Sequence, residues 1–358
     1  MLRAILASPL NLLLVAAPIS WVLEFSAPGS PWVFLAASVS LIPLAGLIGL
    51  GTEELAHRAG PALGGFLNAT FGNAAELIIA IVALRERHVA LVKASITGSI
   101  VGNLLLVLGL SFFVGGLRRR SQRFHRTAAT NTAAMLFLAV VALVMPAVFD
   151  LSLYGSLQAH PAALDRLSLW SALVLIFAYA GSLIYAFTTQ RDLFRPNEGW
   201  DRGSHLTVGA AVATLAVGTI LTTVQAEILV GALQPALTRF GLSEMFVGVI
   251  VIALIGNAAE HYSAVVAAHR NQMTLAVEIA IGSSAQIALF VAPAVVLYSM
   301  AIGRPMSLLF NAFEIAAITL SVLSTVIVVV DGESNWVEGL QLIAVYLILA
   351  IAFYFVPA

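Results

Sequence analysis

The sequence predicts an all-α integral membrane protein of eleven transmembrane helices, with one leading helix followed by two five-helix repeats of inverted topology. This prediction rests on the composition, on the number of long apolar stretches, and on a polar motif that occurs twice. Of the 358 residues, 60% are hydrophobic and only 10% are charged. Soluble domains are about 25% charged, so this composition is typical of proteins embedded in a bilayer.

Long apolar stretches give the number of helices, because about 20 apolar residues suffice to span a bilayer. Eleven such stretches can be marked. They cover residues 10–26, 32–52, 63–84, 91–117, 127–149, 168–188, 205–234, 243–268, 273–302, 308–330 and 336–356. The first also resembles a signal peptide, since Arg3 precedes a short apolar run. No clear cleavage site with small residues follows, so we expect a retained helix.

Composition excludes several classes of function. A net charge of −1 argues against nucleic-acid binding. The chain contains no cysteine, which rules out disulfides, thiolate metal sites and iron–sulfur clusters. We therefore expect no cofactor, the lipid bilayer as the surrounding partner, and no nucleic acid; a homo-oligomer is compatible with the sequence.

Basic residues predict the orientation. With the N-terminus in the cytoplasm, the cytoplasmic loops carry eleven arginines and the outside loops carry six basic residues. This distribution favours a cytoplasmic N-terminus and a C-terminus outside, in a prokaryotic cell (inner) membrane. The run RRRSQRFHR (118–126) supplies five of the eleven arginines. We interpret it as a topology anchor at the lipid headgroups.

The pentapeptide GNAAE occurs at 72–76 and again at 256–260. When 72–99 is aligned with 256–283, a fixed offset of 184, 11 of 28 positions are identical. We infer an internal duplication: a leading helix (1–31), a first repeat (32–188), a cytoplasmic linker (189–204) and a second repeat (205–358). Because five helices per repeat is an odd number, the second repeat enters the membrane inverted, which is typical of transporters with a substrate site at the midplane.

The motif residues are the candidate ion ligands. A carboxylate at the bilayer centre costs at least ~2.5 kcal/mol on insertion scales, so the two motif glutamates indicate function. Each motif asparagine lies three residues before its glutamate and shares a helix face with it. Each motif glycine lets backbones approach closely, or lets the helix break and expose carbonyl oxygens. The predicted metal ligands are Gly72, Asn73, Glu76, Gly256, Asn257 and Glu260.

Inversion is expected to bring Glu76 and Glu260 to equivalent depths. Two close carboxylates in a low dielectric cannot both remain ionised without a cation, so they bind either protons or a divalent ion. These two states exclude each other, which is the basis of antiport. The donors are all oxygen atoms, which suits a hard cation such as calcium, whereas zinc or copper would call for histidine or cysteine.

Other polar residues within the apolar stretches are candidates for the proton and cation pathway. Glu53 has an alternative interpretation as a solvated residue beside Glu54 at a helix end, and His261 could equally be a packed side chain. The asparagine and glutamine side chains could instead form hydrogen bonds between helices. The pathway candidates are Glu53, Glu227, Ser99, Asn103, Ser283, Ser284, Gln286, Gln225 and His261.

Four segments resemble the signatures of the calcium/proton exchanger family, within the calcium:cation antiporter superfamily. They are LNATFGNAAELI, GSIVGNLLLVLGLSFFVGG, GNAAEHYSAVVAA and EIAIGSSAQIALFVAP. The resemblance implies eleven helices and export of cytosolic Ca²⁺ in exchange for H⁺ by alternating access, with Glu76 and Glu260 as the central carboxylates. The linker carries three acidic residues against three arginines, so calcium sensing by this segment is not expected.

Several alternatives stay open at this point. A sodium/calcium exchanger of the same superfamily would need additional oxygen ligands, and a Mn²⁺/H⁺ exchanger would use almost the same residues. An intramembrane metalloprotease would need a pattern such as His-Glu-x-x-His, which the sequence lacks. We therefore expect a transporter and not an enzyme. A channel is disfavoured because twin carboxylates in inverted repeats suit occluded binding.

Overall fold

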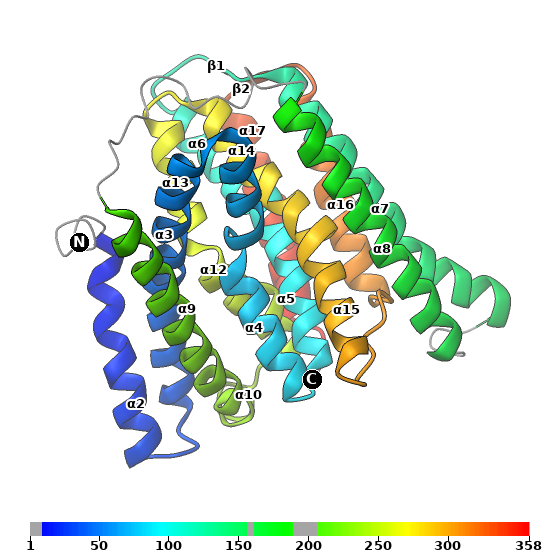
Figure 1. The fold of residues 1–358 in the computed structure, drawn as a ribbon. Coiled ribbons are helices and arrows are strands. Elements are labelled where there is room, and N and C mark those ends of the chain that lie inside the picture. Colours follow the sequence, from blue (N-terminus) through cyan, green and yellow to red (C-terminus); the bar gives the residue numbers. More distant parts are fainter. Residues whose placement is uncertain (1–8, 156–160, 189–205, 358) are drawn as a thin grey trace. The chain divides into compact units, whose positions relative to one another are not determined.

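The computed structural model describes residues 9–155, 161–188 and 206–357, and most of this part of the chain is helical (Figure 1). The predicted linker 189–204 lies outside the described residues. The helices are η1 (Pro9–Val15), α2 (Ala16–Ser26), α3 (Pro31–Phe71), α4 (Ala74–Arg85), α5 (Val89–Val101), η2 (Gly102–Val107), α6 (Leu108–Gly116), α7 (Arg126–Tyr154), α8 (Pro161–Thr188), α9 (Val208–Gly231), α10 (Leu233–Phe240), α11 (Glu244–Phe246), η4 (Val247–Ile252), α12 (Ala253–Gly256), α13 (Ala258–His269), α14 (Met273–Gln286), η5 (Ile287–Val291), α15 (Ala292–Ala301), α16 (Ala312–Val329) and α17 (Trp336–Tyr354).

The prediction of a helical membrane protein is confirmed, with two short strands as the exception among the described residues. Among the described residues, nine helices are long and apolar enough to cross a membrane, or ten if the pair 233–240 and 244–256, bent by 111°, is taken as one span. The predicted spans 63–84 and 243–268, which carry the motif, are not single uninterrupted helices. The first is divided between α3 and α4, and the second between α12 and α13. Both interruptions fall at the Gly-Asn of the motif.

The described residues form two compact units. The first comprises Met1–His88, Ala180–Leu242 and Ile255–Ala259, and the second comprises Val89–Tyr179, Ser243–Leu254 and Glu260–Ala358, each where described. Each unit therefore takes helices from both halves of the sequence. A sequence repeat and a compact unit need not coincide, because helices from different repeats can share one core.

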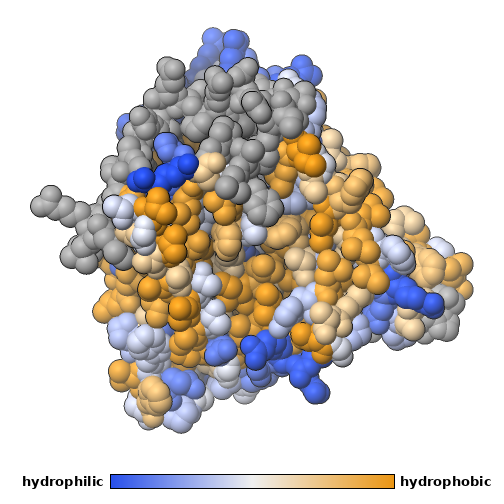
Figure 2. Space-filling view, viewed as in Figure 1, coloured by the Kyte–Doolittle hydropathy of each residue, from blue (hydrophilic) through white to orange (hydrophobic). Residues whose placement is uncertain are grey.

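In the first unit, α3 and α9 pack along their lengths in antiparallel directions. Glycines permit the close approach: a Cβ on Gly51 would lie 2.8 Å from the Leu215 backbone nitrogen, and one on Gly218 would lie 3.2 Å from Ile48 Cγ1. The outer side of α9 exposes Val212, among other residues, and Figure 2 shows hydrophobic side chains over this part of the unit. This surface suits contact with lipid.

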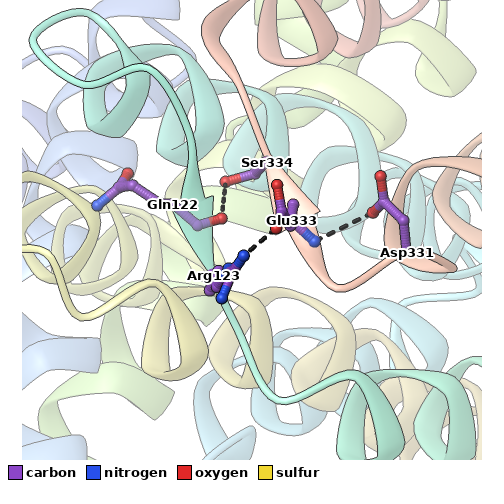
Figure 3. A network of polar contacts seen from close by, with 5 residues as sticks. All are labelled: Gln122, Arg123, Asp331, Glu333 and Ser334. Carbon is purple, nitrogen blue, oxygen red and sulfur yellow. Dashed lines mark hydrogen bonds and ion pairs between the residues drawn. The ribbon is translucent and has the colours of Figure 1, made fainter.

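In the second unit, α5 packs against η4 and α6 packs against α17. Small residues again set the spacing, because a Cβ on Gly98 would collide with the carbonyl of Val249, and Gly339 lies directly against the backbone of α6. Two short strands, β1 (Gln122–Arg123) and β2 (Glu333–Ser334), pair antiparallel (Figure 3). They join the α6–α7 connection to the α16–α17 connection.

The same tight turn follows both copies of the motif. Arg87 (φ 68°) and Asn271 (φ 64°) are the described non-glycine residues with positive φ, and they are 184 positions apart. The backbone hydrogen bonds around them also correspond: His88 N donates to Ala83 O (2.9 Å), and Gln272 N donates to Ala267 O (2.9 Å). The π-helical segments η2 and η5 begin 185 positions apart, at residues 102 and 287. These local similarities extend the correspondence beyond the identical residues.

Candidate cation-binding site

Both copies of the motif interrupt a helix. In the first copy, Gly72 and Asn73 separate α3 from α4, and in the second copy Asn257 separates α12 from α13. Glu76 and Glu260 consequently lie in the first turns of α4 and α13. The N-terminus of a helix carries a partial positive charge, so this position stabilises an ionised carboxylate within an apolar region.

In the first unit, the two copies of the motif meet. A Cβ on Gly256 would lie 3.4 Å from both Cγ and Oε1 of Glu76. In the same region, a Cβ on Gly46 of α3 would lie 3.9 Å from Ala259 Cβ. The segment 256–259 of the second copy therefore lies against α4 and α3. Glycine at 256 leaves free the space beside the Glu76 carboxylate that any larger residue would occupy.

In the second unit, Glu260 accepts a short hydrogen bond from Ser283. The distance from Ser283 Oγ to Glu260 Oε2 is 2.6 Å. Asn103 Nδ2 in turn donates to Ser283 Oγ over 3.2 Å. Asn103 and Ser283 are 1% and 6% exposed. Because the serine oxygen accepts from the amide, its own proton is directed to the carboxylate.

The remaining motif amides and Ser99 are buried. Asn73 is 1% exposed, Asn257 is 0% exposed, and Ser99 of α5 is 4% exposed. Buried polar side chains in proteins are almost always hydrogen-bonded, so these groups have defined orientations. They are oxygen donors of the kind that calcium prefers.

Two of the predicted pathway residues form hydrogen bonds within the helical packing, one to a neighbouring helix and one to its own helix. Gln225 of α9 accepts from Ser20 Oγ through Oε1 (2.9 Å) and donates to Ala17 O through Nε2 (3.4 Å), so its amide contacts α2. Ser284 Oγ donates to Ala280 O of its own helix at 2.9 Å. These geometries correspond to helix-packing roles. Gln286 and His261 are half-buried in α14 and α13.

Glu53 and Glu227 are both exposed and do not lie together. Gly51 contacts Leu215 in the antiparallel α3–α9 pair. Glu227 is twelve positions beyond Leu215, while Glu53 lies two positions beyond Gly51 in the opposite direction. At 1.5 Å per helical residue, the two glutamates are separated by roughly 20 Å along the pair.

Glu54 is more buried than the sequence predicts. We interpreted it as a solvated neighbour of Glu53, whereas it is buried, with 7% of its surface exposed. Glu54 lies three residues after Gly51, so it shares the helix face that packs against α9.

The described residues contain no group of three or more His, Cys, Asp or Glu side chains that could hold a metal ion. The motif itself offers carboxylate, amide and backbone carbonyl oxygens. That donor set suits calcium, which takes 6–8 oxygen ligands in flexible geometry.

Comparison with known proteins gives consistent matches over most of the chain. A family model described as sodium/calcium exchanger protein matches residues 29–188 and 210–355. A Ca²⁺/H⁺ antiporter of Synechocystis sp. is 42% identical over 362 residues, covering 96% of each chain. The Ca²⁺/H⁺ antiporter ChaA of Bacillus subtilis is 41% identical over 333 residues, covering 90% of this chain and 92% of that protein. These relatives are transporters and not enzymes.

Solved structures agree in fold. The structure of native YfkE has a TM-score of 0.84 and 38% identity, and the match covers 97% of this chain and 100% of that chain. The crystal structure of the H⁺/Ca²⁺ exchanger CAX has a TM-score of 0.71, with 96% of this chain and 91% of that chain covered. At 16% identity, the second match supports the fold alone.

Proposed function

The chain belongs to the sodium/calcium exchanger protein family, and on this premise we propose that it is a secondary active antiporter that exports cytosolic Ca²⁺ in exchange for H⁺. The names of the relatives that are 41–42% identical support this choice of ions. The observation that carries the proposal is the contact between the two motif copies, in which Gly256 leaves open the space beside the Glu76 carboxylate.

In the proposed mechanism, Glu76 and Glu260 bind either protons or Ca²⁺. When both carboxylates are protonated they lose their affinity for the cation, and when calcium binds it displaces the protons, so that the two ions exclude each other. Asn73, Asn257 and the carbonyls freed at the helix breaks supply further oxygens. Ser283, held by Asn103, orients the Glu260 carboxylate. Alternating access then opens the occupied site first to one side of the membrane and then to the other.

We further propose eleven transmembrane helices, with a leading helix (1–31) and inverted repeats at 32–188 and 205–358 joined by a cytoplasmic linker. The similar turns at Arg87 and Asn271 and the antiparallel packing of α3 and α9 support the inversion. The N-terminus is placed in the cytoplasm and the C-terminus outside. The distribution of arginines supports this orientation.

The test uses purified protein in sealed liposomes. An imposed pH gradient without sodium is expected to drive ⁴⁵Ca²⁺ uptake that a protonophore abolishes. Glu76→Gln and Glu260→Gln are each expected to abolish uptake while leaving the protein folded, because an amide cannot exchange a proton for a cation. Glu86→Gln, an exposed residue just after α4, is the matched control and is expected to transport normally.

Each alternative has its own outcome in this assay. Uptake that requires a sodium gradient in place of the pH gradient would identify a sodium/calcium exchanger. Uptake of ⁵⁴Mn²⁺ at much lower concentration than calcium would identify manganese as the substrate. Retained exchange in either glutamine variant would remove that carboxylate from the mechanism.

A further inference from the structure

The arginine-rich segment 118–126, expected to be a headgroup anchor, also contacts the turn that follows α13. Two of its side chains, Arg119 and Gln122, make these contacts, and we refer to the pair as the clasp. Arg119 Nη2 donates to His269 O (3.2 Å), and its Nη1 donates to Gly115 O (3.1 Å). Gln122 Nε2 donates to Ala268 O (3.2 Å) and to Asn271 Oδ1 (2.8 Å).

These acceptors lie where a helix most needs donors. Ala268 and His269 are the last two residues of α13, and the terminal carbonyls of a helix lack partners within the helix. Ala268 O also accepts from the backbone nitrogen of Asn271 in the turn (3.0 Å), so Gln122 is its second donor. The C-terminus also carries a partial negative charge, which favours a cation such as the Arg119 guanidinium. The clasp therefore stabilises this end of α13 both by hydrogen bonding and by charge.

The turn itself is tightly constrained. Asn271 adopts a left-handed conformation (φ 64°), which is uncommon for a residue with a side chain. The bond from Gln122 to the Asn271 amide oxygen ties this residue to the clasp. Both the position and the conformation of the turn are thereby fixed.

Packing and backbone pairing within the second unit hold the Gln122 side of the clasp in place. Gln122 is 3% exposed, and its backbone pairs with Ser334 of β2 (Figure 3). Gly115 leaves room for its side chain, because a Cβ on Gly115 would collide with Gln122 Oε1. The neighbouring Arg123 instead directs its guanidinium to Glu333 in an exposed ion pair (2.9 Å).

The clasp acts on the two helices that hold Glu260. α13 carries Glu260 and α14 carries Ser283, and the 2.6 Å hydrogen bond between these residues links the helices. α13 ends at His269, nine residues after Glu260 and about 14 Å along the helix, and the turn follows directly. The pair of helices is thus fastened at two points, by the Glu260–Ser283 bond and by the clasp.

The two repeats differ here. At the offset of 184, the positions that correspond to Arg119 and Gln122 are Gly303 and Met306. Neither side chain can donate a hydrogen bond. The two side chains of the clasp therefore have no donor counterparts at the corresponding positions of the second repeat.

We propose that Arg119 and Gln122 are positioning residues for calcium exchange. By holding the turn after α13, they fix the register of α13 against α14 and keep the Glu260 carboxylate against Ser283. This inference rests on the proposed function, since it assigns the clasp an effect on the calcium site. It adds a part of the chain remote from the motif to the residues that set calcium affinity.

The experiment compares the double variant Arg119→Gln/Gln122→Leu with wild type and with Arg123→Gln. The control removes a charge from the same segment, at a side chain directed to Glu333. Hydrogen exchange of residues 267–272 is expected to accelerate about tenfold in the double variant, which corresponds to the loss of one to two net hydrogen bonds. The calcium concentration for half-maximal uptake is expected to rise about fivefold to tenfold, with the control unchanged in both measurements.

Two further variants separate positioning from general destabilisation. Arg119→Lys, introduced alone into the wild-type chain, retains a cationic donor. This variant is expected to keep most of the calcium affinity that the double variant loses. Asn271→Gly accommodates the left-handed conformation and so keeps the fold, but it removes the acceptor of Gln122. It is expected to raise the half-maximal calcium concentration as well.

The outcomes are distinguishable. Faster exchange at 267–272 with unchanged calcium dependence, or a loss of maximal rate alone that follows the amount of folded protein, would overturn the positioning role. If wild-type protein transports no calcium against a pH gradient, the proposed function fails. In that case the hydrogen-exchange comparison still shows whether the clasp holds the turn.

Discussion

At the contact between Glu76 and Gly256, a glycine hydrogen stands where any other residue would place a Cβ beside a carboxylate. Calcium ligands lie at about 2.3–2.6 Å from the ion, so a ligand carboxylate needs open space on the side where the ion binds. Gly256 leaves such a space beside Glu76. The glycine of the motif therefore has a steric role in addition to ending α12.

Gly256→Ala is expected to raise the calcium concentration for half-maximal uptake by at least about tenfold, a loss of about 1.4 kcal/mol in binding. The new methyl group would lie 3.4 Å from Glu76 Oε1, in the space proposed for the cation. The measurement is calcium-dependent uptake in liposomes. Gly49→Ala, where a Cβ meets nothing within 4 Å, is the control, and an unaffected Gly256→Ala variant would show that the space is not used.

The neighbouring serines of α14 give a second test at this scale. Ser283→Ala removes the donor to Glu260, and hydrogen bonds to charged groups contribute about 1.5–3 kcal/mol. We expect calcium affinity to fall about tenfold or more in uptake assays. Ser284→Ala removes only a bond to its own helix and is expected to transport normally. Equal effects of the two changes would contradict a specific role for Ser283.

Among the elements, the leading helix α2 is attached to the first unit by a polar contact. Gln225 is fully buried, and both ends of its amide bond to α2, through Ser20 and through the carbonyl of Ala17. A glutamine in an apolar helix gives the same sequence signal whether it binds an ion or a neighbouring helix. Only its partners decide between the two roles.

Gln225→Leu is therefore expected to lower the melting temperature of the detergent-solubilised protein by a few degrees, since it removes two hydrogen bonds worth about 1 kcal/mol each. Calcium affinity of the folded protein should be unchanged. Scanning fluorimetry and uptake assays measure the two effects separately. Thr223→Val, which loses a bond to its own helix, is the control. An unchanged melting temperature together with weakened calcium affinity would indicate that Gln225 belongs to the ion pathway.

At the scale of the whole molecule, hydropathy and composition were sufficient to predict a helical membrane protein, because both follow from the bilayer as solvent. The breaks in the motif helices were one of two alternatives that the motif glycines left open, and hydropathy alone marked each of these segments as a single span. The pairing of β1 with β2 was not predictable, since it joins positions about 210 residues apart with no local pattern. The burial of Glu54 rather than Glu53 depended on which face of α3 meets α9, and the hydropathy of the segment does not encode this.

The proposed orientation is testable by thiol labelling, because the chain contains no cysteine. A single introduced cysteine is then the only thiol in the protein that a maleimide can label. Arg120→Cys and Arg304→Cys place one thiol on each side of the membrane in the proposed topology, both at exposed positions. A membrane-impermeant maleimide added to intact cells is expected to label the second variant only. Labelling of Arg120→Cys alone would show that the orientation is the opposite of the one proposed. Labelling of both variants from outside would contradict the proposed helix count.

The contact of Glu76 with Gly256 also has an evolutionary consequence. After a duplication, each copy of a motif is normally free to accumulate changes of its own. Here a substitution in the second copy is felt by a carboxylate 180 positions earlier in the chain. The two copies are therefore not independent, because a side chain added at position 256 would act directly on the carboxylate of the first copy.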